Sequence, residues 1–212
     1  MIVKRRYIRD EDISASLSPY GILPSAEVCE KIRTYIALLL RWNERISLTS
    51  ITEISEILQI HFGESIFAAS AVPILHGRLA DLGTGAGFPG IPIKIARPDL
   101  DLYLVEPNIK KCAFLSEVLR ALQIDAQVIR TRMETAFASS QQLDYITSRA
   151  VGQWDAILEM GAHLATTGKL VLWVGEQTIS GLASMNHLEW SWQEAIKIPR
   201  TTKRFILAGN KS

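Results

Sequence analysis

The glycine-rich segment 81–90 is the part of the sequence whose residue types point most directly to chemistry. It follows a short apolar run and reads Asp-Leu-Gly-Thr-Gly-Ala-Gly-Phe-Pro-Gly. Glycines allow a tight turn and a close approach of the backbone to a ligand, while a helix that follows offers unpaired N–H groups. A G-x-G-x-x-G pattern starts at Gly85, but in a dinucleotide site the first glycine directly follows the strand, and here that residue is Gly83. A P-loop is excluded, because no Gly-Lys-Ser/Thr follows the turn.

An acidic residue recurs at the end of the next apolar run, at Glu106. A carboxylate in this place can accept hydrogen bonds from both hydroxyls of a ribose, as it does in nucleoside-binding α/β folds. The glycine segment and Glu106 together therefore predict a nucleoside site more strongly than either feature alone. A glycine-rich turn beside an unrelated surface carboxylate is the weaker interpretation.

The elements that must position these residues alternate between short apolar strands and helices from residue 78 onward. Such alternation favours a mostly parallel sheet with helices on both faces, and ligands of such sheets bind at the carboxyl ends of the strands. The fold class is therefore α/β and Rossmann-like. We expect strands at 79–82, 101–106, 126–130, 144–147, 170–174 and 203–207, and helices at 91–96, 109–122 and 154–164.

Residues 1–77 have a different pattern and predict a helical extension before a sheet domain of residues 78–212. Apolar residues recur with helical spacing from Val28 to Trp42, and we interpret Trp42 as a core anchor. A second helix is expected to open at Ser50, because Ser50 and Glu53 have the spacing of a capping box. It would carry His61, which we interpret as a helix histidine satisfied by a neighbour.

The composition and net charge limit the classes of function that suit this chain. The chain has 212 residues, 48% of them hydrophobic, and 23 basic against 22 acidic residues give a net charge of +1. A dedicated nucleic-acid binder usually has a larger positive excess, so composition alone favours a small-molecule enzyme. The two cysteines, Cys29 and Cys112, have no metal-ligand spacing, and a disulfide framework is not expected. No secretory signal or membrane span is visible, so we expect a cytoplasmic protein without a membrane partner.

Several segments resemble those of the bacterial 16S ribosomal RNA guanine-N7 methyltransferases, the RsmG family, also called glucose-inhibited division protein B. The glycine segment with Glu106 looks like motifs I and II of class I S-adenosylmethionine-dependent methyltransferases. The continuation Gly-Phe-Pro-Gly-Ile-Pro and the Arg-Ala after the fourth strand make the resemblance specific to this family. It covers roughly residues 41–175, and its segments are Trp42-Asn43, Ser47-Leu48-Thr49, His61 to Ser65, Asp81 to Pro92, Lys110-Lys111, Phe114-Leu115, Arg132-Met133-Glu134 and Ser148-Arg149-Ala150.

The resemblance implies a seven-stranded class I methyltransferase sheet, S-adenosylmethionine as the cofactor, no metal, and 16S rRNA or the small ribosomal subunit as the partner of a monomer. It assigns Arg149 as the catalytic residue. It assigns to the cofactor Asp81, Gly83, Gly85, Phe88, Glu106, Pro107, Asn108, Met133, Glu134 and Arg149. The sequence departs from the family pattern at Val174, where a lysine is usual, and at Gly63-Glu64, where Leu-Asp is usual.

Motifs and side chains that the sequence lacks narrow the choice of the substrate atom that accepts the methyl group. Guanine N7 carries a lone pair and no proton, so its methylation needs alignment and electrostatic support more than a general base. Exocyclic amines are handled by an Asn/Asp-Pro-Pro-aromatic loop, and the corresponding loop here is Thr-Ser-Arg-Ala. Pyrimidine C5 requires a cysteine, and neither cysteine is well placed. Two alternatives stay open: a methyltransferase of the same fold acting on a small molecule, and a non-catalytic nucleoside-binding protein of ribosome assembly.

Arg149 has two interpretations from sequence. Its guanidinium can pair with phosphate, a guanine edge or a carboxylate at the site, or it can form a structural salt bridge with Asp81 or Glu106. Other basic residues gather in clusters, and a one-sided distribution would matter more for RNA than the net charge does. We expect three clusters to converge on the face of the cofactor site: Lys4 to Arg9, Arg130 with Arg132, and Arg200, Lys203, Arg204 and Lys211.

Overall fold

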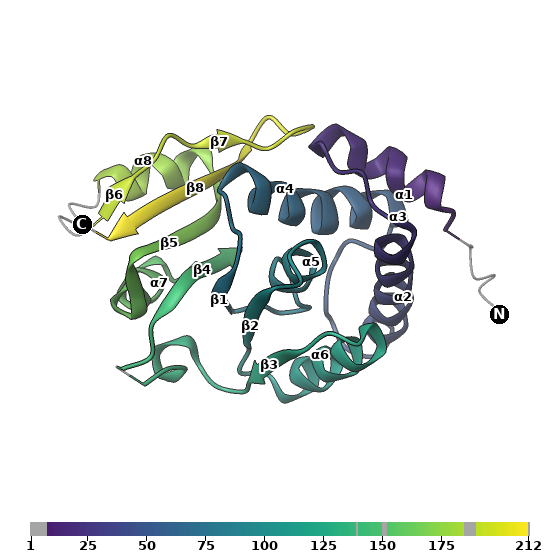
Figure 1. Cartoon of the computed structure of the whole chain (residues 1–212), viewed down its shortest axis with the longest axis horizontal. Coiled ribbons are helices and arrows are strands. Elements are labelled where there is room, and N and C mark those ends of the chain that lie inside the picture. Colours follow the sequence, from purple (N-terminus) through teal and green to yellow (C-terminus); the bar gives the residue numbers. More distant parts are fainter. Residues whose placement is uncertain (1–7, 139, 150–151, 185–189, 212) are drawn as a thin grey trace.

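A computed structural model describes residues 8–138, 140–149, 152–184 and 190–211 (Figure 1). Its centre is an eight-stranded sheet with the order β3-β2-β1-β4-β5-β8-β6, and β7 pairs with β8 off this path. The strands are β1 (Gly77–Leu82), β2 (Leu100–Val105), β3 (Ala126–Ile129), β4 (Leu143–Arg149), β5 (Leu164–Gly175), β6 (Trp190–Trp192), β7 (Ile196–Lys197) and β8 (Arg204–Lys211). Strands β1 to β5 pair in parallel, whereas β8 runs antiparallel to β5.

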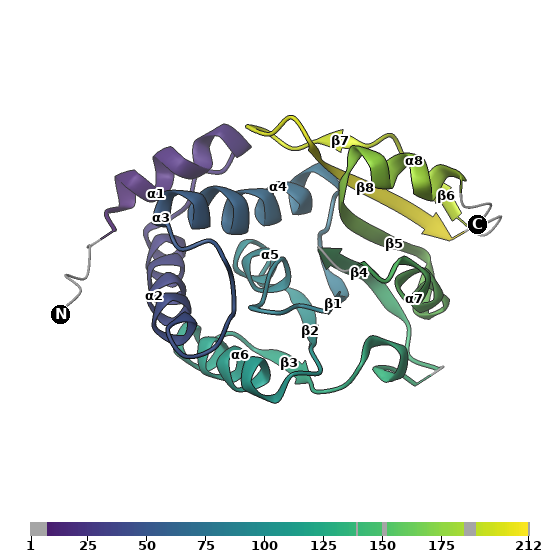
Figure 2. The same cartoon turned by 180° about the vertical axis from the view of Figure 1, so that it is seen from behind.

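Helices precede the sheet and connect its strands. They are α1 (Asp10–Leu17), α2 (Ala26–Asn43), α3 (Ile54–Glu56), α4 (Glu64–Ala71), α5 (Gly90–Ala96), α6 (Ile109–Leu122), α7 (Trp154–Glu159) and α8 (Glu176–Ser184). A π-helical segment (Ile57–Gly63) joins α3 to α4, and 3₁₀ turns occur at Ser18–Tyr20, Met133–Thr135 and Met160–His163. Figure 2 shows α2 beside α6, and these two helices are in contact.

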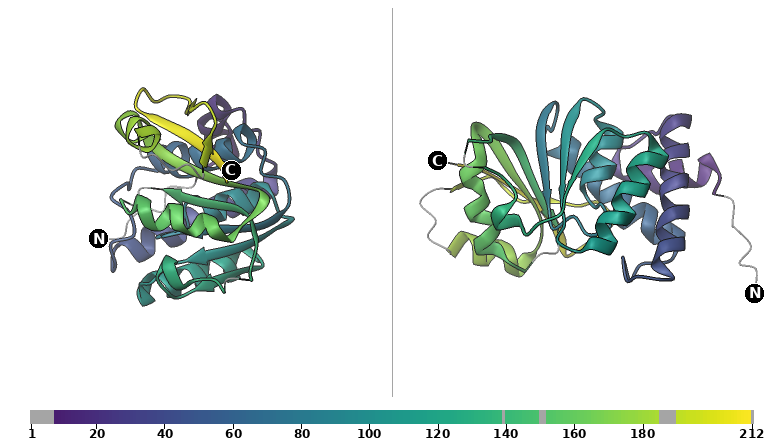
Figure 3. Two further views of the ribbon diagram at one scale, coloured as in Figure 1. Left: turned by 90° about the vertical axis from the view of Figure 1, so that its left-hand side faces the viewer. Right: turned by 90° about the horizontal axis from the view of Figure 1, so that it is seen from below.

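The sheet is buried on both faces, as its central strands require. Alternate residues of β1 point to opposite sides, so Leu79 belongs to one hydrophobic cluster and Ala80 to another. The first cluster contains residues of α1, α2, α5 and α6, and the second contains residues of α7 and α8. In Figure 3 (right) the strands lie between these two layers of helices.

Register brings the ends of three strands together. Leu82 of β1 lies opposite Val105 of β2 and Ser148 of β4. The loops that follow β1, β2 and β4 therefore lie side by side at what we call the carboxyl edge of the sheet, where parallel α/β sheets bind their ligands.

The helix α2 illustrates how sequence builds the N-terminal part. Ser25 caps it, because its hydroxyl accepts a hydrogen bond from the Val28 N–H at 3.3 Å. The apolar stripe that includes Ile32, Tyr35 and Leu39 is buried in the first cluster together with sheet residues. The proposed division of the chain at residue 77 stays a prediction.

The α/β expectation and the expected strands and helices are confirmed, with four differences. The sheet has eight strands in the described residues, because the short β6 and β7 add to β8. Strand β5 begins at Leu164, and the predicted helix 154–164 ends as a 3₁₀ turn. The helix α1 was not predicted. The capping box at Ser50 is wrong, because α3 begins only at Ile54; the Thr49 hydroxyl accepts from the Ile51 N–H and so stabilises a non-helical turn.

Candidate active site at the carboxyl edge of the sheet

The glycine loop follows β1 and turns sharply into α5. Gly83, Gly85 and Gly87 have φ angles of 64°, 59° and 92°, in the left-handed region that favours glycine. A Cβ atom on Gly87 would lie 2.6 Å from Cδ1 of Ile91, so the loop also packs too closely there for a side chain. By contrast, a Cβ on Gly85 would meet no atom closer than 3.9 Å, so this part of the loop leaves space beside its backbone.

Asp81 lies beneath the loop and is fully buried. Its Oδ2 accepts from the Thr84 hydroxyl at 2.5 Å and from the Gly90 N–H at 2.9 Å, and its Oδ1 accepts from the Thr147 hydroxyl at 3.0 Å. Burial raises the pKa of Asp81 to about 6, although these hydrogen bonds oppose the rise. The Asp81 carboxyl group therefore holds the loop in position, and its assignment to the cofactor stays a prediction.

Glu106 closes the other side of the loop. It follows β2 directly, its Oε2 accepts from the Gly85 N–H at 3.1 Å, and its Oε1 accepts from the Asn108 N–H at 2.8 Å. Each carboxylate oxygen can accept a second hydrogen bond, so two acceptor positions remain for a pair of ligand hydroxyls. Asn108 in turn caps α6 through the N–H groups of Lys110 and Lys111. The open glycine backbone with this carboxylate fits the ribose end of S-adenosylmethionine.

The other predicted cofactor residues lie near the same edge. Pro107 is exposed between Glu106 and Asn108. Met133 is buried in the 3₁₀ turn after β3, and Glu134 beside it is exposed. The Glu106 N–H donates to the Ile129 carbonyl at the end of β3, which places these segments next to each other.

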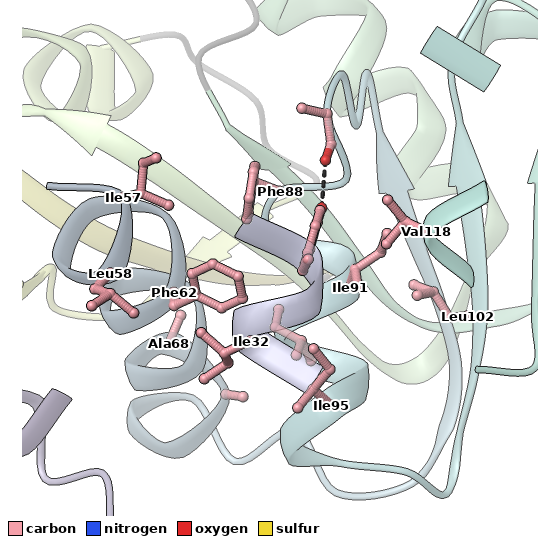
Figure 4. Packing of buried hydrophobic residues seen from close by; sticks show 14 of the residues in the cluster. Ile32, Ile57, Leu58, Phe62, Ala68, Phe88, Ile91, Ile95, Leu102 and Val118 are labelled. Atoms are coloured by element: carbon pink, nitrogen blue, oxygen red, sulfur yellow. Dashed lines mark hydrogen bonds between the residues drawn. The ribbon is translucent and has the colours of Figure 1, made fainter. Parts of the chain in front are cut away.

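Phe88 is the centre of an aromatic stack that joins the loop to the N-terminal helices. Its ring stacks on Tyr35 with a centroid distance of 5.1 Å and on His61 with 4.3 Å. The Tyr35 hydroxyl also donates to the Ala86 carbonyl of the loop. Phe62 meets Phe88 edge-on, and Figure 4 shows both side chains inside the first hydrophobic cluster. The N-terminal helices therefore help to hold the glycine loop in its conformation.

Arg149 ends β4 and points across this stack. Its guanidinium carbon lies 5.7 Å from the centre of the Phe88 ring. Nη1 donates to the Ile60 carbonyl at 2.9 Å, and Nη2 lies 2.6 Å from Nδ1 of His61. Among the described residues Arg149 forms no salt bridge with Asp81 or Glu106, so the structural interpretation made from sequence is wrong in its partners.

His61 is the partner that fixes Arg149. Burial, followed by the nearby Arg149 charge, lowers the pKa of His61 to about 3, so its ring is neutral. A neutral ring accepts at one nitrogen and donates at the other. With Arg149 donating to Nδ1, Nε2 carries the proton and donates to the Thr49 hydroxyl at 2.9 Å. The expectation that neighbours satisfy His61 is confirmed.

Glu64 is a second charged residue, after Arg149, in the surroundings of His61. It is fully buried, and its Oε1 accepts from Nε and Nη2 of Arg204 at 2.9 and 2.6 Å. Oε2 has no hydrogen-bond partner in the part of the chain that the structure describes. Burial raises the pKa of Glu64, while the Arg204 and Arg149 charges oppose the rise. Sequence reasoning did not assign a role to Glu64, Thr49 or Tyr35; Glu64 and Thr49 lie within segments of the family resemblance, but Tyr35 gave only the signal of a core residue.

Both cysteines are buried and form no disulfide, and the Cys112 thiol donates to the Glu106 carbonyl at 3.0 Å. No group of three or more metal-ligating side chains occurs in the described ranges. None of the helices that the structure describes could cross a membrane. Val174 is buried in the second hydrophobic cluster, on the layer of α7 and α8.

Fold and site together define the class of protein. A sheet covered on both faces, a glycine loop after β1 and an acidic residue after β2 are the features of a class I S-adenosylmethionine-dependent methyltransferase. Solved structures of this kind align with the chain. The ribosomal protein L11 methylase from Lactobacillus delbrueckii subsp. bulgaricus has a TM-score of 0.59 and 14% identity over 73% of this chain and 80% of that one. The precorrin-6y C5,15-methyltransferase from Geobacter metallireducens has a TM-score of 0.58 and 14% identity over 78% and 91%. These likenesses show the fold.

The family follows from sequence comparison. Residues 28–199 match the profile of the GidB family, described as rRNA small subunit methyltransferase G. Proteins named ribosomal RNA small subunit methyltransferase G are 34% identical in Mycoplasma capricolum, over 76% of this chain and 71% of the relative, and 33% identical in Mesoplasma florum, over 88% and 78%. The relative in Desulfitobacterium hafniense is 41% identical over 68% of this chain and 61% of its own length. The chain belongs to the rRNA small subunit methyltransferase G family.

Proposed function

We propose that this protein transfers a methyl group from S-adenosylmethionine to N7 of a guanine in 16S ribosomal RNA. Family membership supports the reaction class and the ribosomal substrate. The observation that carries the choice of nucleophile is the position of Arg149, at the carboxyl edge, over Phe88 and beside the glycine loop. The cofactor, when bound, supplies an electrophilic methyl group.

The side chains at the site suit a nucleophile that has no proton to lose. His61 is neutral, and both its ring nitrogens are engaged by Arg149 and Thr49, so it is no free base. Asp81 is enclosed beneath the loop and has no exposed surface. The Phe88 ring is covered by Tyr35, His61 and Phe62, so the groups left to act on a substrate are the remaining N–H donors of Arg149, which can orient a base.

Arg149 is the residue we propose to be catalytic. Two of its nitrogens bond to Ile60 and His61, which holds the guanidinium plane fixed before substrate arrives. A preorganised donor of this kind can orient the base without reorganising during the reaction. The remaining N–H donors of Arg149 can bind O6 of guanine, which leaves the N7 lone pair free to attack the methyl group. The remaining assigned residues, Gly83, Gly85, Glu106 and their neighbours, are proposed to bind the cofactor.

The experiment is methylation of small ribosomal subunits by wild type and by Arg149→Ala, with N7-methylguanine mapped in the RNA. Removal of one preorganised donor group predicts a loss of about 100-fold or more in kcat. Arg97→Ala is the matched control, because Arg97 also donates to backbone carbonyls, of Ile74 and Ala96, but lies after α5. Retained activity in Arg149→Ala would contradict the catalytic role.

The same assay separates the alternatives. Transfer of label from the cofactor to metabolites but not to ribosomal subunits would support a small-molecule enzyme of this fold. Cofactor binding without transfer to RNA would support a non-catalytic assembly protein, an alternative that Val174 keeps open. A monomeric state and a cytoplasmic location stay predictions, which gel filtration and cell fractionation would test.

A further inference from the structure

The segment formed by β7, β8 and the connection between them has basic side chains and no acidic one. From Ala195 to Lys211 the sequence contains five basic residues and no acidic one. Lys197, Arg200 and Lys203 lie at the turn, and we call residues 197–203 the basic turn. All three are exposed, and none of them forms an ion pair with another described residue. Three solvated cations are thus presented without a neutralising carboxylate.

Strand pairing places the basic turn at the same edge as the active site. Arg204, the residue after the turn, pairs with Gly175 at the end of β5, and β5 pairs with β4, where Arg149 lies opposite Trp173. Arg204 also bonds to Glu64, which follows His61 by one helical turn, and His61 bonds to Arg149. The turn is therefore anchored to the helix that positions Arg149. In Figure 1 it lies between β8 and the N-terminal helices.

The shape of the turn suits an extended anion. Residues of the turn line a shallow recess of about 410 Å³, which includes Lys197, Arg200 and the side chains of Thr201 and Thr202. Arg200 has a φ of 59°, in the left-handed region that residues other than glycine rarely adopt. Cationic groups beside hydroxyl donors are what proteins use to contact the phosphates of nucleic acids.

We propose that the basic turn binds phosphates of the RNA strand beside the guanine to be methylated. This inference rests on the proposed function, and it adds where the substrate lies: from Arg149 the strand would run over β5 and β8 to the turn. Lys211 is not part of the proposed phosphate-binding surface. It lies at the far end of β8, opposite Trp190, so the expectation that it joins Arg200, Lys203 and Arg204 at the site is wrong. Lys4 to Arg6 lie outside the described residues.

The experiment removes the three charges together. The triple variant Lys197→Gln, Arg200→Gln and Lys203→Gln leaves Arg204 and its ion pair with Glu64 intact. We expect KM for small ribosomal subunits to rise about 10-fold or more and the salt dependence of log KM to fall by a slope of about 2, because each phosphate contact to single-stranded RNA contributes about 0.7. The value of kcat and the Kd for S-adenosylmethionine should stay within about twofold of wild type, since the turn is outside the cofactor site.

The control removes three charges from the opposite edge of the sheet. Arg78, Lys169 and Lys211 lie at that edge, near the start of β1, in β5 and at the end of β8. Their triple glutamine variant has the same net charge as the test variant, and we expect its KM and salt slope to match wild type within about twofold, since screening over about 10 Å weakens distant charges.

The possible results test the role of the basic turn and the proposed function separately. Equal KM values for the two triple variants would overturn the role of the turn while leaving the methyltransferase intact. No RNA methylation by wild type would instead contradict the proposed function. If the triple variant does not fold, as judged by circular dichroism, the single variant Lys203→Gln replaces it, with an expected rise in KM of about threefold against Lys211→Gln.

Discussion

The lowered pKa of His61 makes the free energy of unfolding depend on pH. The variant His61→Gln tests this dependence. The pKa of His61 is about 3 in the folded state and 6.5 in the reference state. The unfolded chain therefore binds the proton first, and stability is lost as pH falls below 6.5. Between pH 7 and pH 5 this loss amounts to about 2 kcal/mol. Glutamine does not titrate, and its side-chain carbonyl can still accept a hydrogen bond from Arg149. The variant should therefore not show this decrease in the free energy of unfolding.

Asp81 acts in the opposite direction. Its pKa is raised to about 6 from 3.8, so the folded state binds the proton first and gains stability as pH falls. Over the same interval the gain is about 1 kcal/mol. Glu64, whose pKa is also raised, contributes with the same sign. The contributions of Asp81 and Glu64 are the same in wild type and in His61→Gln, so they cancel when the two proteins are compared. His61→Gln should therefore gain about 2 kcal/mol relative to wild type on going from pH 7 to pH 5.

Urea unfolding followed by tryptophan fluorescence at pH 7 and pH 5, at constant ionic strength, gives the two free energies of unfolding. His76→Gln is the control, because His76 is exposed and the structure gives it no hydrogen bond. Its free energy should follow that of wild type at both pH values. If the curves of wild type and His61→Gln run parallel, His61 is protonated in the folded state at pH 5, and its role as a neutral acceptor for Arg149 is refuted.

Two further variants test the loop and the cofactor site. Gly87→Ala should destabilise the fold by about 2–4 kcal/mol in urea unfolding, because it adds strain at positive φ to a 2.6 Å clash with Ile91; Gly21→Ala, with positive φ but no atom within 4 Å, should cost clearly less. Glu106→Gln should weaken S-adenosylmethionine binding about tenfold or more in calorimetry, since hydrogen bonds to a charged acceptor are lost, whereas Asp101→Asn on the same strand should bind as wild type does. Equal destabilisation by the two alanines, or unchanged affinity in Glu106→Gln, would contradict these roles.

The sheet could be predicted because its signal is local. Each strand is a short apolar run, and the glycine loop and Glu106 follow such runs directly, so their meeting at one edge follows from parallel order. The pair Gly85 and Glu106 is joined by a hydrogen bond, as that order requires. Helix α6 has the predicted bounds because Asn108 caps it and an apolar stripe continues to Leu122.

The fine structure of the site depends on contacts between distant segments, and these have no local signal. Arg149 and His61 are 88 residues apart, and the Tyr35 hydroxyl reaches a carbonyl 51 residues away. Tyr35 occupies an apolar position of α2 that would suit any large core residue. The π-helical segment that carries His61 interrupts a run with ordinary helical spacing. Ser50 shows the converse, a local capping pattern that Thr49 overrides.

The net charge of +1 includes basic residues whose charges are cancelled by nearby carboxylates and others that have no ion pair with a described residue. Five of the six ion pairs among the described residues involve α1 or α2 and their caps, where carboxylates cancel the charges of Arg9, Lys31, Arg33 and Arg41. The cations of the basic turn have no such partner. Since salt screens exposed charges beyond about 8 Å at physiological ionic strength, a phosphate at the turn experiences mainly local cations. A nearly neutral chain can therefore attract RNA at one edge and still bind unrelated nucleic acid weakly, which predicts that KM for ribosomal subunits depends on salt although the total charge is small.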